Sequence, residues 1–507
     1  MMYFDWIKHH AAQRADKLAL VDALSDERLN YGEFDAQIDR LADGLRRQHG
    51  VVKGDRVALL ARTGIDAFLV QFACVRIGAI FTPLNWRLSG RELREICDDA
   101  QPTVLLYHAE FRDKMEVAQT GLAHALANGS IEGWDAVEAP VSRTPASAIG
   151  LEDPWCILYT SGTTGKPKGV VIPYRMIIAN VLNFSVPIRA TQDSVFLCAL
   201  PTFHTGGLNV YSNPIFHAGG TVVTMGDFDA DIAVRILQAH RPGVTHFFGT
   251  PTHYQMMAET SAFETGSFPS LVNCGIGGAG LTGPLILQWL DKGVPIQPTY
   301  GMTEIGPGIL TTDLHRVREK IGTSGRPSLH MELIVADEHG QELPPHAIGE
   351  IRVRGPVVMT GYWRNAEATR QAFYGDWFKT GDLAYRDEEG FVYIVDRSKE
   401  MYVSGGENVY PAEIERVILE MPDVLMCGVV GVADERWGEV GAAYVAARRG
   451  ARVDPADIRA YCAKKLARYK LPKYIRVLAE IPLTSSGKVD KNQLRILAAA
   501  DAQEGRQ

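Results

Sequence analysis

One stretch decides the fold of this chain: Tyr159-Thr160-Ser161-Gly162-Thr163-Thr164-Gly165-Lys166-Pro167-Lys168-Gly169. It places small hydroxyl residues, three glycines and two lysines directly after the apolar segment 155–158. Glycines let backbone amides approach an anion closely, hydroxyls add hydrogen-bond donors, and lysines neutralise charge. These are the properties of a loop that holds a polyphosphate.

A Walker P-loop is the obvious alternative, and the spacing argues against it. A Walker loop has four residues between its glycines and a Ser or Thr after its lysine. Here Gly162 and Gly165 enclose two residues, and Pro167 follows Lys166. The loop is therefore predicted to bind nucleotide phosphates by another arrangement.

The stretch resembles the phosphate loop of the adenylate-forming (AMP-binding) superfamily, whose members include acyl- and aryl-CoA synthetases, adenylation domains of peptide synthetases and beetle luciferases. Further motifs follow in the family's order, so the resemblance covers essentially the whole chain. It is similar above all to the acyl-CoA synthetase, or fatty-acid–CoA ligase, branch. The resemblance implies that ATP contacts come from Thr160, Ser161, Gly162, Thr163, Thr164, Gly165 and Lys168.

Length and composition restrict the number of domains and the class of protein. A chain of 507 residues with 46% hydrophobic and 22% charged residues is expected to form at least two globular domains. A formal net charge of −8 argues against a general nucleic-acid binder. Seven scattered cysteines without metal-like spacing indicate reduced core thiols in a cytoplasmic protein. Neither a signal peptide nor a membrane span is expected, and monomer and homodimer both stay open.

The pattern along the chain predicts an α/β fold. Short apolar runs such as 56–60, 104–107 and 221–224 alternate with helix-like segments, which is typical of mainly parallel sheets covered by helices. After about residue 320, strands at 331–335 and 349–354 flank a polar turn and predict a small β-rich part. The family resemblance then implies a large N-terminal domain over residues 1–396, a hinge at 397–400, and a small mobile α+β domain over 401–507.

Two glycine-containing motifs in the middle of the chain extend the predicted nucleotide site. Tyr300-Gly301-Met302-Thr303-Glu304 matches the family element that faces adenine, contacts the α-phosphate through its threonine and holds Mg²⁺ through its glutamate. A carboxylate is a suitable hard ligand for Mg²⁺. In Gly275-Ile276-Gly277-Gly278-Ala279-Gly280-Leu281, residues Gly277 to Ala279 match the backbone beside adenine and the acyl pocket. The family usually carries proline where this chain has Gly280.

The later motifs match the ribose contacts, the hinge and the catalytic lysine. Thr380-Gly381-Asp382 and Arg397 correspond to the two ribose contacts, and an aspartate is able to accept hydrogen bonds from both ribose hydroxyls. Lys399 stands at the hinge position. Lys488, after Ser486-Gly487, matches the lysine that assists adenylate formation, with Lys491 as the nearest decoy. Gly405 and Gly406 match the tunnel for the pantetheine arm of coenzyme A.

The segment Pro201-Thr202-Phe203-His204-Thr205-Gly206-Gly207 distinguishes between substrates. Amino-acid-activating relatives usually carry Phe-Asp here, whereas this chain has Phe203-His204, so no carboxylate is offered to a substrate ammonium. Gly206, Gly207, Gly278, Gly280 and Gly306 are expected to leave room in the acyl pocket. The predicted substrate is an apolar monocarboxylic acid, either a fatty acid or an aryl-propenoic or benzoic acid. The basic segment 468–473 is either a contact for CoA phosphates or a solvated surface.

The resemblance implies an ATP- and Mg²⁺-dependent ligase that forms an acyl-adenylate and passes the acyl group to coenzyme A. Lys488, His204 and Thr303 are the expected catalytic residues. Two alternatives remain at this point. One is an enzyme that delivers acyl-AMP to a carrier-protein thiol or to a luciferase-like oxidation. The other is an inactive binding protein on the same fold, which the intact Lys488, Glu304, Asp382 and Arg397 disfavour.

Overall fold

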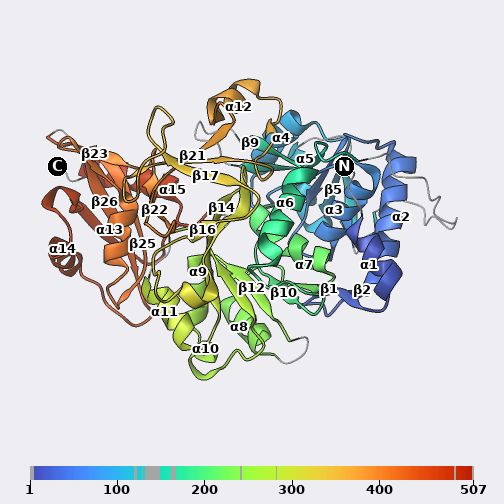
Figure 1. Ribbon diagram of the computed structural model, residues 1–507, viewed down its shortest axis with the longest axis horizontal. Coiled ribbons are helices and arrows are strands. Elements are labelled where there is room, and N and C mark those ends of the chain that lie inside the picture. Colours follow the sequence, from blue (N-terminus) through green and yellow to red (C-terminus); the bar gives the residue numbers. More distant parts are fainter. Residues whose placement is uncertain are drawn as a thin grey trace.

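The computed structural model describes residues 5–118, 123–127, 130–131, 149–160, 167–239, 243–280, 283–434, 436–484 and 487–504. Its elements divide along the long axis of the molecule (Figure 1). The first helices lie at one end, and the C-terminal elements, coloured orange to red, gather at the other. Among the described helices, none is long and apolar enough to cross a membrane.

A nine-stranded sheet forms the base of the nucleotide-site elements. Its central strands pair in parallel, as expected for strands that alternate with helices, and both edges are antiparallel. In spatial order the strands are β16 (Arg326–Pro327), β15 (Gly306–Thr311), β14 (Ile296–Met302), β13 (Asn273–Ile276), β12 (His246–Gly249), β10 (Val195–Cys198), β11 (Thr221–Thr224), β1 (Leu18–Asp22) and β2 (Arg28–Asn30).

A second, eight-stranded sheet carries the phosphate-loop strands. It too is parallel at its centre and antiparallel at both edges. In spatial order the strands are β19 (Gly361–Tyr362), β9 (Lys168–Pro173), β8 (Pro154–Thr160), β4 (Ile80–Pro83), β3 (Arg56–Leu60), β5 (Val104–His108), β6 (Ala123–Ala127) and β7 (Ser130–Ile131).

The helices form layers on both faces of these sheets. The layer between the sheets shares one apolar core with both; it contains α2 (Tyr31–His49), α3 (Ile65–Ile77), α6 (Tyr174–Ser185) and α7 (Ser212–Ala218), with α1 (Trp6–Arg14) packed beside them. The outer face of the nine-stranded sheet is covered by α8 (Ala230–Gln238), α9 (Pro251–Ala258), α10 (Ser261–Thr265) and α11 (Gly283–Asp291). The outer face of the other sheet is covered by α4 (Gly90–Ala100) and α5 (Arg112–Ala118).

Strand alternation explains this layering. Successive side chains of a strand point to opposite faces. In β12, Phe248 joins the core between the sheets and Phe247 joins the outer core. Val222 and Val223 of β11 divide in the same way. Because both faces are apolar, each sheet has to be covered on both sides, and the predicted α/β architecture is confirmed.

The remaining elements form two smaller antiparallel-rich sheets. The first contains β17 (Glu332–Ala336), β18 (Gly349–Arg354), β21 (Trp377–Arg386), β20 (Phe373–Tyr374) and β22 (Val392–Arg397), with α12 (Ala366–Ala372) nearby. The C-terminal sheet contains β24 (Glu407–Val409), β23 (Tyr402–Ser404), β26 (Gly438–Ala447), β25 (Val424–Asp434) and β27 (Tyr474–Leu478). Its helices are α13 (Pro411–Ile418), α14 (Pro455–Ala463) and α15 (Lys491–Glu504).

The predicted elements exist, and their ends shift by a few residues. The strand β14, from Ile296 through Met302, contains the first residues of the predicted adenine-facing motif. Tyr300 therefore lies within a strand and pairs with Leu310 of β15. This placement fixes the Tyr300 backbone by sheet hydrogen bonds.

Candidate active site

Three predicted residues meet at the end of the small β-rich sheet. Asp382 of β21 and Arg397 of β22 are paired across the two strands, and Arg397 Nε donates to Asp382 Oδ1 at 3.1 Å. The Tyr300 hydroxyl donates to the other carboxylate oxygen, Oδ2, at 2.5 Å. The Asp382 side chain is buried, whereas the Arg397 side chain is 46% exposed. The structure thus joins the predicted adenine and ribose residues in one hydrogen-bonded group.

The charges in this group reinforce one another. The Asp382 carboxylate, more than any other cause, holds the pKa of Arg397 above its usual value. Burial, followed by the same carboxylate, raises the pKa of Tyr300 well above the ordinary tyrosine value. Tyr300 therefore stays a neutral hydroxyl donor, and Asp382 keeps its ionic partner.

Glu304 lies in the turn that joins β14 to β15, together with Thr303. Its side chain is buried, and the Tyr362 hydroxyl donates to Oε1 at 3.2 Å. Burial raises the pKa of Glu304, since this environment supplies little positive charge to the carboxylate. A divalent cation would supply the missing charge, so Glu304 fits the predicted metal role.

Among the described residues, Glu304 is the carboxylate that fits a Mg²⁺ site. Within the described ranges, no group of three or more His, Cys, Asp or Glu side chains is arranged to hold a metal ion. Mg²⁺ is commonly held by one or two carboxylates together with phosphate oxygens and water. A single carboxylate such as Glu304 is compatible with that pattern.

The phosphate loop is anchored at both ends by the β8–β9 pair. Thr160 and Lys168 lie opposite each other in register, and the Thr160 hydroxyl is 3.4 Å from the Lys168 carbonyl oxygen. The Lys168 ammonium lies 5.1 Å from the centre of the Tyr362 ring, on the side of the site that holds Glu304. Ser161, Gly162, Thr163, Thr164 and Gly165 lie outside the described residues.

The glycine turn after β13 brings the backbone close to two other elements. A Cβ on Gly277 would lie 2.5 Å from the Thr299 carbonyl oxygen, so only glycine fits this approach. Gly278 has φ +81°, and a Cβ there would lie 3.4 Å from Lys488 Cε and 3.8 Å from Nζ. Ala279 follows on the exposed side of the turn. The lysine from the C-terminal domain thus lies beside the glycine turn of the N-terminal part.

Lys488 is carried by a tight hairpin tip. Leu483 and Val489 form a β-bridge, and Thr484 N donates to the Lys488 carbonyl oxygen at 2.6 Å. Burial, followed by the nearby charge of Arg397, lowers the pKa of Lys488 to about 8. Asp382 and Glu304 act on Lys488 in the opposite direction. The Lys488 ammonium is therefore within electrostatic reach of the ribose residues Asp382 and Arg397 and of the metal candidate Glu304.

His204 lies against the ring of Phe203, with 4.6 Å between ring centres. Burial and then the charges of Lys488 and Arg87 lower the pKa of His204 to about 3. The imidazole is neutral near pH 7 and presents no charge to a substrate carboxylate. Arg87 was not expected near this position; its sequence context, Trp86-Arg87, carries no motif that would have indicated it.

The glycines expected to leave room in the acyl pocket divide into two kinds. A Cβ on Gly280 would meet no atom within 4 Å, and one on Gly306 would first meet atoms at 3.6 Å. Gly207 contradicts the expectation, because a Cβ there would lie 2.5 Å from the Leu200 carbonyl oxygen. Gly207 is needed for close packing of the backbone and does not leave open space.

An aromatic wall lies behind the glycine turn. A Cβ on Gly275 would lie 2.5 Å from both the Tyr211 hydroxyl and Phe248 Cδ2. Tyr211 and Phe248 contact each other with 5.5 Å between ring centres, and Phe184 lies 5.9 Å from Tyr211 on another side. The single buried hydroxyl of this wall is bonded to Asn273 at 2.5 Å.

The predicted tunnel residues lie apart from the nucleotide group, whereas Lys399 is within electrostatic reach of Arg397, Asp382 and Glu304. Lys399 is exposed in the turn that directly follows β22. Gly405 and Gly406 form the turn between β23 and β24, both with positive φ, and Gly405 packs against Trp437. A Cβ on Gly406 would meet no atom within 4 Å. This arrangement of the two parts does not bring these glycines to Glu304 or Asp382.

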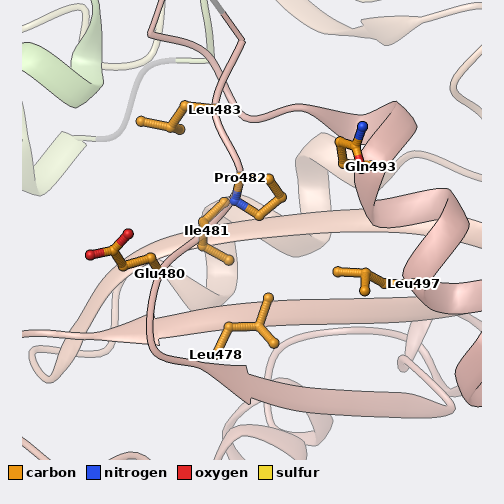
Figure 2. Close-up of a pocket in the computed structure, with 7 residues that line it drawn as sticks. All are labelled: Leu478, Glu480, Ile481, Pro482, Leu483, Gln493 and Leu497. Atoms are coloured by element: carbon orange, nitrogen blue, oxygen red, sulfur yellow. The ribbon is translucent and has the colours of Figure 1, made fainter.

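A shallow apolar groove on the C-terminal domain contains none of these residues. It has a volume of about 580 Å³ and is lined by Leu478, Glu480, Ile481, Pro482, Leu483, Gln493 and Leu497 (Figure 2). The groove lies beside the hairpin that carries Lys488, and its only charged lining residue is Glu480, so the lining offers no positive charge to a phosphate.

Comparisons with known proteins identify the family of this chain. The family model described as AMP-binding enzyme matches residues 7–363, and that of the AMP-binding enzyme C-terminal domain matches residues 413–488. The chain is 38% identical over 467 residues to a feruloyl-CoA synthase of Amycolatopsis, covering 92% of this chain and 93% of that one. It is 35% identical over 503 residues to an indoleacetate–CoA ligase of Aromatoleum aromaticum, covering 98% of each.

Comparison with solved structures also finds similarity to an enzyme that binds ATP. The chain superposes on ATP-bound MatB from Rhodopseudomonas palustris with a TM-score of 0.89 and 32% identity, covering 97% of this chain and 98% of that one. The apo form of MatB gives a TM-score of 0.79 at the same coverage. From the matched family models and these relatives, the chain belongs to the AMP-binding enzyme family and is an AMP-forming acid–thiol ligase.

Proposed function

We propose that this enzyme uses ATP and Mg²⁺ to activate an apolar monocarboxylic acid, aryl or fatty, and transfers the acyl group to coenzyme A. One observation carries the proposal most directly. Lys488 of the C-terminal domain lies beside Gly278 and within the electrostatic reach of Arg397, Asp382 and Glu304. Four motifs that are far apart in the sequence therefore converge on one point.

The first half-reaction is assigned to this arrangement. A substrate carboxylate oxygen attacks the α-phosphorus of ATP, the bond between the α-phosphorus and its bridging oxygen breaks, and pyrophosphate leaves. Lys488 offsets the negative charge that builds up at the attacked phosphate, which a preorganised cation in a dry site does efficiently. Asp382 and Arg397 orient the ribose, and Glu304 would hold the metal. When bound, Mg²⁺ neutralises phosphate charge.

The arrangement of the two parts supports assignment to adenylate formation. The greater similarity to ATP-bound MatB than to its apo form points the same way. For the second half-reaction, the C-terminal domain is expected to rotate about Lys399, within the proposed hinge 397–400. Rotation would withdraw Lys488 and bring Gly405 and Gly406 towards the site. The CoA thiol would then attack the acyl carbon, with loss of its proton and departure of AMP.

The substrate class is supported by the polarity of the acyl side. Phe203 and a neutral His204 stand where amino-acid-activating relatives present a carboxylate. The buried core directly behind the glycine turn is aromatic as well, with Phe184, Tyr211 and Phe248 packed together and the Tyr211 hydroxyl bonded to Asn273. The names of two relatives, a feruloyl-CoA synthase and an indoleacetate–CoA ligase, favour a flat aryl acid over a long aliphatic one.

A panel of acids tests the proposal. AMP release is measured with and without CoA for cinnamic-type, indolylacetic, benzoic and fatty acids and for the corresponding α-amino acids. An aryl acid is expected to give the highest kcat/KM, with CoA-dependent AMP release. Efficient activation of an α-amino acid would contradict the assignment of Phe203-His204. ATP–pyrophosphate exchange without CoA-dependent turnover would instead favour delivery to a carrier-protein thiol.

A further inference from the structure

The hairpin that carries Lys488 does not reach the site unsupported. Its tip lies against the first turn of α9, a helix of the N-terminal part. The Thr250 hydroxyl is 3.5 Å from the Gly487 carbonyl oxygen. A Cβ on Gly487 would lie 2.9 Å from His253 Cε1, so the imidazole edge is in close contact with the backbone just before Lys488.

The His253 ring is held rigidly by its own helix. Thr250 and His253 form a capping box at the start of α9. The Thr250 backbone N–H donates to His253 Nδ1 at 3.2 Å, and the Thr250 hydroxyl lies 2.6 Å from the same nitrogen. Because Nδ1 accepts a backbone hydrogen bond, a neutral ring carries its proton on Nε2. Phe228 packs edge-on against the ring, with 4.3 Å between centres.

The two edges of the imidazole therefore have different partners. Nδ1 faces the helix cap, and the Cε1–Nε2 edge faces Gly487. A Cβ built on Gly487 would lie 3.5 Å from Nε2. Burial lowers the pKa of His253 to about 4, so the ring is uncharged near pH 7 and does not repel Lys488. A neutral ring, hydrogen-bonded to its helix cap, thus meets the hairpin at the residue before the lysine.

The other end of α9 also meets the C-terminal domain. Glu259 caps the C-terminal end of α9 and forms an ion pair with Arg448, which follows β26. The helix therefore contacts the C-terminal domain at both ends. The hairpin contact is the one that bears on the position of Lys488.

We propose that His253 is a positioning residue for adenylate formation, whose Cε1–Nε2 edge seats the hairpin tip at Gly487 and so places Lys488 beside Gly278. The proposal rests on the proposed function in one respect, that Lys488 acts in the first half-reaction. His253 itself touches neither substrate nor nucleotide in this assignment. It acts only through the lysine, and only while the C-terminal domain occupies the arrangement described above.

His253→Asn separates this role from helix capping. An asparagine Oδ1 stands close to the place of Nδ1 and is able to accept the Thr250 N–H, so the cap is kept and the far edge of the ring is lost. We expect adenylate formation, followed by ATP–pyrophosphate exchange, to slow about 10- to 100-fold, mainly in kcat, because misplacing a catalytic group by about 1 Å has effects of that size. Thioester formation from supplied acyl-adenylate should change less than twofold.

A double-mutant cycle tests the contact from the hairpin side. Gly487→Ala places a methyl group against the His253 ring, in addition to backbone strain at φ +74°. In the His253→Asn background the ring edge is absent, so the same substitution should slow adenylation less than it does in the wild type. His246→Asn removes another buried histidine, one bonded to Ile188, and should leave the ratio of the two half-reactions unchanged.

Each outcome has a definite meaning. If His253→Asn adenylates at the wild-type rate, or slows both half-reactions equally, or if the cycle is additive, the positioning role is wrong. If Lys488→Ala itself leaves adenylation intact, the proposed function fails and not only this inference. Circular dichroism and thermal unfolding of every variant separate a local effect from misfolding, and His253→Gln provides a second variant if His253→Asn does not fold.

Discussion

The ribose end of the site and the lysine end are built by different means. Asp382 and Arg397 face each other across adjacent strands, so sheet pairing fixes their relation before any ligand arrives. Lys488 instead arrives on a hairpin tip whose contact with α9 consists of a weak hydroxyl contact and one ring edge. Strand pairing keeps Asp382 and Arg397 in a fixed relation, whereas the small contact between the hairpin and α9 is easily broken. This contrast suits the proposed function, in which Lys488 serves only the first of the two steps.

The largest effect is expected from removing the lysine at the lysine end of the site. Lys488→Ala should remove about 3–4 kcal/mol of transition-state stabilisation from adenylate formation, comparable to the loss of one oxyanion-hole donor. ATP–pyrophosphate exchange measures this step. Thioester formation from supplied acyl-adenylate should be largely spared, because the hairpin is expected to have moved away. Equal slowing of both steps would show that the lysine end is as permanent as the ribose end.

Hindering the domain motion should give the next largest effect, with both ends of the site left intact. Proline at Lys399 fixes φ in the turn after β22 and should hinder rotation of the C-terminal domain. Lys399→Pro should slow thioester formation on the order of 100-fold, as misplaced reactants do, and leave pyrophosphate exchange close to wild type. Rapid-quench assays of each half-reaction provide the measurement. Slower exchange with normal thioester formation would place the hinge elsewhere.

A smaller effect is expected from Glu304, which belongs to the permanent part of the site. Glu304→Gln keeps the side-chain shape and the Tyr362 contact but removes the charge that would hold Mg²⁺. The Mg²⁺ concentration for half-maximal exchange should rise about 10- to 100-fold, with slower adenylation at saturation. Titration of exchange activity with Mg²⁺ checks this, with Asp387→Asn as a control carboxylate outside the site. An unchanged Mg²⁺ requirement would assign the metal to another residue.

The smallest expected effect is a pH dependence of adenylation at the lysine end of the site, which the ribose end should not share. The arrangement described here lowers the pKa of Lys488 to about 8, below the ordinary lysine value of 10.5, so the proton is lost as pH rises through about 8. The protonated form is the active one, and kcat/KM for adenylation should therefore fall about tenfold per pH unit above that value. Lys488→Arg keeps its charge and should lose this alkaline limb, although its absolute rate is lower. A wild-type profile that stays flat to pH 10 would contradict the buried position of Lys488.

Several features of the site were not open to prediction from the sequence. The motif Ser486-Gly487-Lys488 predicted the lysine, but nothing in it indicated that the lysine would lie against α9. Tyr362, which holds Glu304, stands in no motif and is nearly sixty residues away from it. The predicted role of Gly207 was wrong because the direction of its missing side chain depends on the path of Leu200 and Pro201.

The sequence by itself determined the alternation of strands and helices, the membership of the family and the identity of most candidate residues, because local spacing and residue type carry that information. Tertiary structure alone decided which of these residues meet. Asp382 gains Tyr300 as a partner, burial together with Lys488 and Arg87 keeps His204 neutral, and Lys488 lies beside Gly278 while its hairpin lies against His253. Burial, pKa and position within a site depend on neighbours far away in the chain, and no local pattern specifies them.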